Sequence, residues 1–192
     1  MKEGKIFFVT SNQHKFSEAE RILKAKGINI AHHPERVEEV RAEDCATVAR
    51  EAAVCAYEKL KKPLFVEDSG LFIDALNGFP GVYSAFAFKR IGNEGLLKLM
   101  KGKEEKERSA KFVSCVAFAG EGKVKVFSGE CLGSIAEEMK GKEGFGFDPV
   151  FIPERSGKTF AQDVELKEKV SHRKMALMKF AKWLKKESRG EK

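Results

Sequence analysis

The sequence has few cysteines and no long apolar run at its start. Its cysteines show no C-x-x-C spacing: they are Cys45, Cys55, Cys115 and Cys131. A zinc site or a disulfide framework is therefore not supported, and buried free thiols are expected. The apolar run Ile6–Val9 is too short for a signal-peptide core or a membrane span. We expect a cytoplasmic protein with no membrane partner.

Length and charge set two further bounds. With 192 residues and 42% hydrophobic content, the chain is long enough for one sizeable core and short for two. We expect a single domain over residues 1–192, with a frayed tail at 186–192. The net charge of +7 fits a polyanionic partner, either nucleic acid or a phosphorylated small molecule. The lysine-rich run at 182–186 adds to this charge, although a solvated helix face is the simpler explanation of this run.

The apolar pattern predicts alternating strands and helices. Strands are expected at 6–10, 28–31 and 64–66, with one helix between each pair. This order predicts an α/β sheet. Runs at 111–119 and 124–128 predict an antiparallel hairpin, so the sheet should be mixed. The remaining expectations are a strand or helix at 71–76, a short helix after Asn93 and a last helix capped by Ser171.

Two adjacent acids follow the strand at 64–66. Glu67 and Asp68 precede Ser69-Gly70, which predicts that the strand ends here and a loop begins. A carboxylate at such a strand end can hold a hard cation or accept a proton from water. Neighbouring strand residues point to opposite faces, so one acid should face a cleft and the other the scaffold. The alternative is an acidic turn that caps the next segment.

The first strand leads through a polar loop into a helix, an arrangement that suits phosphate binding. Thr10, Ser11 and Asn12 supply side-chain donors. Lys15 lies in the first helical turn, where a cation is unfavourable unless an anion is bound nearby. Asn12 as a plain helix cap and Lys15 as a surface lysine are the simpler interpretation. The usual P-loop pattern G-x-x-x-x-G-K-[ST] does not occur.

Two later segments have residues suited to ligand binding, and the first of them suits a nucleobase. The glycines beside Phe145 would let its ring stand clear as a stacking platform, although a core aromatic in a turn is the alternative. His172 and Arg173 occupy the first turn of the last helix, where two cations favour an electron-rich ligand. Simple exposure of both side chains is the alternative interpretation.

Five motifs in order resemble the Ham1-like inosine/xanthosine triphosphate pyrophosphatases, which hydrolyse non-canonical purine nucleoside triphosphates. The segments are T-S-N-Q-H-K-F-S-E at 10–18, V-E-D-S-G at 66–70, F-P-G-V-Y-S at 79–84, G-F-G-F-D-P at 144–149 and S-H-R at 171–173. The resemblance implies an elongated α/β fold with a long mixed sheet, two lobes around a central cleft, a homodimer and a Mg²⁺ requirement.

The resemblance also implies roles for individual residues. Asp68 would activate water or bind metal, and the metal carboxylates would be Glu39, Asp68 and Glu67. Glu38 stays possible, because Arg41 and Ala42 depart from the family pattern after Glu39. Substrate-binding roles fall on Thr10, Ser11, Asn12, Lys15, Ser69, Phe145, Gly146, Phe147, Asp148, Lys167, Ser171, His172 and Arg173. Many members carry Arg where this chain has Phe86, so the role of that loop is open.

The expected reaction converts ITP, dITP or XTP and water to the monophosphate and pyrophosphate, with attack at the α-phosphorus. A triphosphate must be neutralised before a nucleophile can approach, which suits Lys15 and a carboxylate-held Mg²⁺. One alternative is a Maf-like pyrophosphatase that acts on pyrimidine or modified triphosphates. Another is a basic nucleic-acid-binding protein, which would explain the charge but not the paired acids. We expect no stable nucleic-acid partner.

Overall fold

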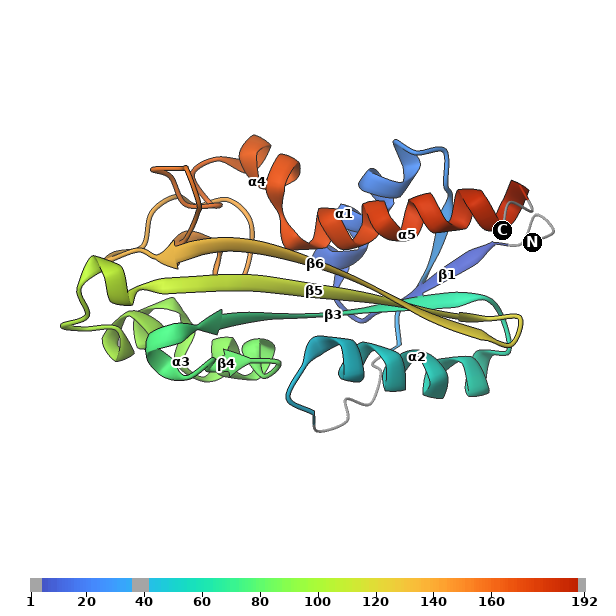
Figure 1. Cartoon of the computed structure of the whole chain (residues 1–192), viewed down its shortest axis with the longest axis horizontal. Helices are drawn as coiled ribbons and strands as arrows, with labels where there is room; N and C mark the ends of the chain where they lie inside the picture. The colour runs from blue at the N-terminus through green and yellow to red at the C-terminus, as the bar shows by residue number, and fades with distance from the viewer. Residues whose placement is uncertain (1–4, 36–41, 190–192) are drawn as a thin grey trace. The chain divides into compact units, whose positions relative to one another are not determined.

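The computed structural model describes residues 5–35 and 42–189, which form an α/β fold (Figure 1). Its helices are α1 (Gln13–Lys24), α2 (Cys45–Leu60), α3 (Ser84–Leu99), α4 (Val164–Val170) and α5 (His172–Arg189). Its strands are β1 (Ile6–Val9), β2 (Ile30–His33), β3 (Leu64–Ile73), β4 (Pro80–Gly81), β5 (Ser109–Gly120), β6 (Lys123–Ile135) and β7 (Phe151–Pro153). The predicted fold class, α/β with a mixed sheet, is confirmed.

The strands form one seven-stranded sheet. Its order is β2-β1-β3-β5-β6-β7, with β4 added beside β3. β1 is parallel to β2 and to β3, whereas β4 and β7 run antiparallel to β3 and β6. Glu121 and Gly122 join β5 to β6, and both have positive φ, as a two-residue hairpin turn of type I′ requires. The predicted hairpin is therefore present, with longer strands than expected.

Strand β3 does not end at the acids, which corrects the predicted loop at Ser69-Gly70. It continues to Ile73 because Gly70 lets β4 approach closely. A Cβ at position 70 would lie 2.3 Å from the carbonyl oxygen of Gly81, so only glycine fits there. The parallel register with β1 reaches Phe65, and the acids lie just beyond that pairing.

Helix α3 begins earlier than the predicted helix after Asn93. Gly92 has φ 59° and ψ −166°, which breaks the helical backbone, and the predicted helix corresponds to the part after this break. The part before Gly92 was not predicted, because there a small residue is buried and large apolar residues are exposed. Ala87 is buried, whereas Phe86 and Phe88 are exposed. Helix α4 was not predicted either, and β2 begins at Ile30 rather than at residue 28.

The chain divides into two compact units. Unit 1 contains the described residues of Met1–Asp68, Ser114–Gly129 and Arg173–Lys192. Unit 2 contains Ser69–Val113 and Glu130–His172. The prediction of a single domain is not tested by this division.

In unit 1, helices α1 and α5 pack on one face of the strands and α2 lies across the sheet from them (Figure 1). The core on the α1 and α5 side contains Phe8, Phe65, Phe118 and Phe180. The rings of Phe8 and Phe65 stack with centroids 4.4 Å apart. α5 continues to Arg189, past the position at which the sequence predicted fraying. None of the helices in residues 5–35 and 42–189 has both the length and the apolar character needed to cross a membrane.

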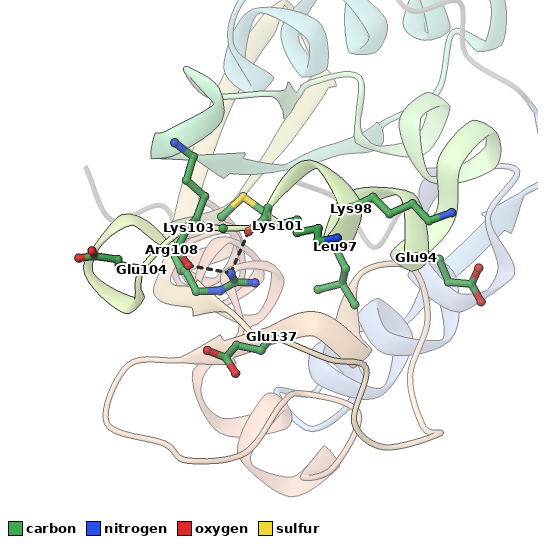
Figure 2. A pocket seen from close by; sticks show the side chains of 10 residues that line it. Glu94, Leu97, Lys98, Lys101, Lys103, Glu104, Arg108 and Glu137 are labelled. Carbon is green, nitrogen blue, oxygen red and sulfur yellow. Dashed lines mark hydrogen bonds between the residues drawn. The ribbon is translucent and has the colours of Figure 1, made fainter.

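In unit 2, the buried Arg108 ties the end of α3 to the end of β6. Its Nε and Nη2 donate to the carbonyl oxygens of Ile135 and Ala136, each at 2.6 Å. Its Nη1 donates to the carbonyl oxygens of Met100 and Lys103, at 3.1 and 3.4 Å. Figure 2 shows part of this arrangement. The guanidinium thus donates to four main-chain carbonyl oxygens, of which those of Ile135, Ala136 and Met100 are reached in buried contacts.

Arg108→Lys should destabilise the protein although it keeps the charge. A single ammonium cannot reach all four carbonyl oxygens, and each buried acceptor left without a donor costs about 1–3 kcal/mol. We expect urea unfolding to show a loss of at least about 2 kcal/mol. The control is Arg90→Lys on the exposed side of α3, which should change stability by less than about 0.5 kcal/mol. Equal stability of the two variants would contradict this account of Arg108.

Candidate active site

The loop between β1 and α1 is held by its own side chains. Asn12 is the N-cap of α1, and its Oδ1 accepts hydrogen bonds from the backbone amides of His14 and Lys15 at 3.0 and 3.2 Å. The backbone N–H of Asn12 donates to Thr10 Oγ1 at 3.2 Å, and His32 Nε2 donates to the Thr10 carbonyl oxygen at 2.8 Å. The capping interpretation of Asn12 is confirmed. Phosphate contacts by Thr10, Ser11 and Asn12 stay predictions.

The Lys15 side chain points to β3. Its Nζ lies 2.9 Å from Glu67 Oε2 and donates to the Glu67 carbonyl oxygen at 3.3 Å. The side chain is 17% exposed, so one end of this cation still reaches the surface. The interpretation of Lys15 as an ordinary surface lysine is therefore wrong, because a buried carboxylate holds it.

Glu67 is enclosed by donors. Its Oε1 accepts from Ser114 Oγ at 2.6 Å and lies 3.2 Å from Arg173 Nε. Its side chain is 1% exposed. Burial by itself raises the pKa of Glu67, but the charges of Arg173 and Lys15 and the hydrogen bond from Ser114 outweigh it and hold the pKa well below its ordinary value. Glu67 is therefore a carboxylate at neutral pH.

Arg173 is held by two carboxylates. Besides its contact with Glu67, its Nη1 donates to Glu18 Oε2 at 2.7 Å. The Arg173 side chain is 3% exposed. The interpretation that Arg173 is simply exposed is wrong. Its predicted role in reading the base stays a prediction.

Asp68 points away from Glu67, as the strand alternation predicts. It is half-buried, and the Cys45 thiol at the start of α2 donates a hydrogen bond to it. Burial, together with the charge of Asp68 and this hydrogen bond, raises the pKa of Cys45 far above its ordinary value. Cys45 therefore stays a neutral thiol that donates to the Asp68 carboxylate.

The described carboxylates do not form a ready metal cage. Within residues 5–35 and 42–189, no group of three or more His, Cys, Asp or Glu side chains is arranged to hold a metal ion. Glu38 and Glu39 lie outside the described residues. The metal roles of Glu39, Glu67 and Asp68 stay predictions.

Unit 2 brings together Phe145, Asp148 and Lys167. Lys167 Nζ lies 2.8 Å from Asp148 Oδ2 and 4.5 Å from the centre of the Phe145 ring. The amide of Phe145 donates to the same Asp148 oxygen at 2.8 Å. Lys167 and Asp148 are both buried, whereas Phe145 is half-buried. One face of the Phe145 ring is therefore occupied by a fixed cation.

The glycines around Phe145 have separate roles. Gly144 has φ 76°, and a Cβ there would lie 2.2 Å from Asp148 Oδ2. A side chain at this position would displace the carboxylate that fixes Phe145. Gly146 has φ 63°, and its carbonyl oxygen accepts from Asn93 Nδ2 at 3.1 Å. Phe147 is buried and packs edge-on against Phe88, which makes it a core residue of this unit.

The start of α5 is buried. His172 stacks on Phe112 with centroids 4.6 Å apart and an interplanar angle of 10°. Ser171 is 4% exposed and His172 is 3% exposed, so the interpretation of this segment as exposed is wrong. Their contacts to a base, and that of the half-buried Ser69, stay predictions.

A pocket of about 700 Å³ lies elsewhere in unit 2 (Figure 2). Its lining combines Lys98, Lys101 and Lys103 with Glu94, Glu104 and Glu137, around the buried Arg108. None of the predicted site residues lines it. Lys98 lies in the last turn of α3, and Lys101 and Lys103 follow the end of the helix, where the helix dipole favours cations without any ligand.

Comparison with known proteins identifies the family. The model of the Ham1 family matches residues 6–183. The chain belongs to the Ham1 family. A protein of Methanopyrus kandleri named dITP/XTP pyrophosphatase is 48% identical over 183 residues, which cover 94% of this chain and 96% of that protein. A Pyrococcus horikoshii protein of the same name is 46% identical, over 94% of this chain and 97% of its own length.

Solved Ham1 structures share the fold. The Staphylococcus aureus Ham1 protein is similar with a TM-score of 0.81 and 31% identity, over 95% of this chain and 100% of its own. A nucleoside-triphosphatase / dITP/XTP pyrophosphatase from Mycobacterium abscessus gives a TM-score of 0.72 and 33% identity, over 92% and 97%. The Ham1 fold therefore covers almost the whole chain.

The contribution of Glu67 to stability should disappear in acid. Because its folded pKa lies below the ordinary value of 4.5, the unfolded state binds more protons as the pH falls through that value. Glu67 therefore stabilises the fold above about pH 4.5 and loses this effect at lower pH. Urea unfolding of the wild type and Glu67→Gln should show a difference at pH 7 that narrows below pH 4.5. A difference independent of pH would contradict the ionised state of Glu67.

Proposed function

We propose that this chain hydrolyses non-canonical purine nucleoside triphosphates (ITP, dITP and XTP) to the monophosphate and pyrophosphate. The observation that carries the proposal is the 48% identity, over 94% of the chain, to a protein named dITP/XTP pyrophosphatase. A Maf-like activity and a nucleic-acid-binding function find no support among these relatives. A cytoplasmic location, where the nucleotide pool lies, and a homodimer are parts of the same proposal.

The polyphosphate is bound in unit 1 at the start of α1. An ammonium has three N–H donors, and Lys15 directs two contacts to Glu67. The remaining donor serves a phosphate oxygen. Thr10 and Asn12 place this loop, since their hydrogen bonds fix the turn that enters α1. The site thereby supplies positive charge before the nucleophile approaches.

Asp68 accepts the proton of the attacking water. It is half-buried and lies on the face of β3 opposite to the enclosed Glu67, so it can meet solvent and substrate. The Cys45 thiol donates to its carboxylate and thereby orients it. No covalent intermediate is required, because an activated water attacks the α-phosphorus in line and pyrophosphate leaves.

A divalent cation, which we propose to be Mg²⁺, would be held by Asp68 in the presence of the substrate phosphates. This donor set fits the usual mode of Mg²⁺, which takes about one or two carboxylates and keeps several waters. When bound, the ion neutralises charge on the phosphates and on the leaving pyrophosphate. Glu39 or Glu38 is the proposed second carboxylate.

The base is bound by unit 2 residues. The Phe145 ring provides a stacking face, while Lys167 and Asp148 fix that ring from their buried ion pair. His172 is the proposed donor to the O6 oxygen of hypoxanthine or xanthine. Adenine has an amino group at this position and would place a donor against a donor.

A nucleotide panel tests the function. Release of pyrophosphate should be measured with ITP, dITP, XTP, GTP, ATP and pyrimidine triphosphates, with Mg²⁺ and with chelator. We expect rapid release from the first three and much slower release from ATP. Fastest release from a pyrimidine triphosphate, or no release from any of these nucleotides, would overturn the proposal.

Asp68→Asn should lose most turnover and keep the fold. An amide cannot accept the proton from water, and loss of a general base alone costs about 10²–10⁴-fold in rate. The rate of ITP hydrolysis at saturating ITP is the measurement, and circular dichroism is the control for folding. Turnover within a few-fold of the wild type would remove Asp68 from this role.

His172→Ala tests base choice more cleanly than Arg173→Ala, because Arg173→Ala also breaks the contact with Glu67. His172→Ala should lower kcat/KM for ITP far more than for ATP, since the lost donor pairs with O6. The loss from one hydrogen bond is roughly tenfold or more. An equal fall for ITP and ATP would show that His172 acts in folding or in phosphate binding.

A further inference from the structure

We propose that Glu67 is a positioning residue, which holds Lys15 and Arg173 in place for the substrate and does not bind the metal. The proposal rests on the function proposed above and deepens it by separating the roles of two adjacent acids. It replaces the metal role that the sequence suggested for Glu67.

Both oxygens of the Glu67 carboxylate are already used. Oε1 accepts from Ser114 Oγ at 2.6 Å and faces Arg173 Nε at 3.2 Å, while Oε2 faces Lys15 Nζ at 2.9 Å. Mg²⁺ needs oxygen ligands at about 2.0–2.1 Å in near-octahedral geometry and keeps several waters. A side chain that is 1% exposed has no room for a hydrated ion, and two adjacent cations would repel it.

Charge balance explains why a carboxylate is needed at this position. Lys15 and Arg173 bring two positive charges from α1 and α5 to β3, and Glu67 contacts both. Glu18 neutralises the other end of Arg173, with a contact of 2.7 Å. Without Glu67, the two cations would repel each other and Lys15 would lose the acceptors that set its direction.

Lys15 depends on Glu67 through two different atoms. Its ammonium contacts the side-chain Oε2 and also the main-chain carbonyl oxygen of Glu67. The backbone contact survives substitution, but the charged contact does not. An ammonium that turns freely on its flexible stem would present its third donor in no fixed direction, and phosphate binding would lose precision.

The first experiment measures how well Lys15 is held in the substrate-free protein. Limited acetylation followed by peptide mass spectrometry gives the rate at each lysine. In Glu67→Gln we expect Lys15 to react about tenfold faster, the factor that corresponds to loss of a charged hydrogen bond. Lys179, which donates to the Ser128 carbonyl oxygen in the same unit, reports whether the fold is intact and should not change. An unchanged rate at Lys15 would overturn the proposal.

Glu18→Gln is the matched control. It removes the same charge from the same group of residues, at a carboxylate that contacts Arg173 at 2.7 Å. Lys15 should react in this variant at nearly the wild-type rate. Acceleration equal to that in Glu67→Gln would show a general effect of lost charge and would contradict a specific role of Glu67.

Ser114→Ala covers the case in which Glu67→Gln does not fold. It removes the hydrogen bond at 2.6 Å and leaves all four charges in place. Glu67 should then be less firmly fixed, and Lys15 should react faster than in the wild type. If Glu67→Gln cannot be prepared, an unchanged acetylation rate of Lys15 in Ser114→Ala would overturn the proposal.

Metal binding separates the two acids directly. Titration of the substrate-free protein with Mn²⁺, followed by electron paramagnetic resonance, should give an affinity for Glu67→Gln within about twofold of the wild type, a difference below about 0.5 kcal/mol. Asp68→Asn should bind Mn²⁺ more weakly than either. A fall in Glu67→Gln as large as that in Asp68→Asn would make Glu67 a ligand.

These readouts also separate this proposal from the proposed function. Acetylation and Mn²⁺ binding need no nucleotide, so a protein that fails to hydrolyse ITP can still show Lys15 held by Glu67. Conversely, normal ITP hydrolysis with an unchanged Lys15 rate in Glu67→Gln would reject the positioning role and leave the function in place.

Discussion

Burial of the Glu67 carboxylate is the constraint on which unit 1 depends. An ionised carboxylate removed from water is costly unless donors and opposite charges replace its hydration. Here Lys15 comes from α1, Ser114 from β5 and Arg173 from α5, and all of them meet one residue of β3. These polar contacts therefore bring the first turns of α1 and α5 to β3 and β5. They act in addition to the apolar packing around Phe65 and Phe180.

Much of the fold could be predicted because it follows from local periodicity. The apolar faces of α1 and α5, the turn at Glu121-Gly122 and the alternation across Glu67 and Asp68 depend on residues close in sequence. The end of β3 could not be predicted in this way. Ser69-Gly70 is typical of a loop, but Gly70 is required by the approach of Gly81, a contact that no local pattern reveals.

The candidate site shows the same division. The motif residues Lys15, Asp68 and Asp148 could be named from the sequence, whereas the contacts that each of them makes could not. Ser114 is 47 residues from Glu67, and nothing around it marks a buried hydroxyl donor. Glu18 and Arg173 are 155 positions apart. Glu18 belongs to the first motif and could be noticed in the sequence, but its contact with Arg173 depends on how α1 and α5 pack.

Adjacent acids acquire different chemistry because the strand pleat sends them to different surroundings. On one face of the strand, Glu67 contacts fixed donors. These donors keep the carboxylate ionised and separate it from solvent, so it does not exchange protons with water. Asp68 accepts a hydrogen bond from the neutral Cys45 thiol and stays half-buried. Proton transfer requires a carboxylate whose protonation can change during turnover, and a group held by two cations resists protonation. The same fold therefore makes one acid a fixed counter-ion and leaves its neighbour available for chemistry.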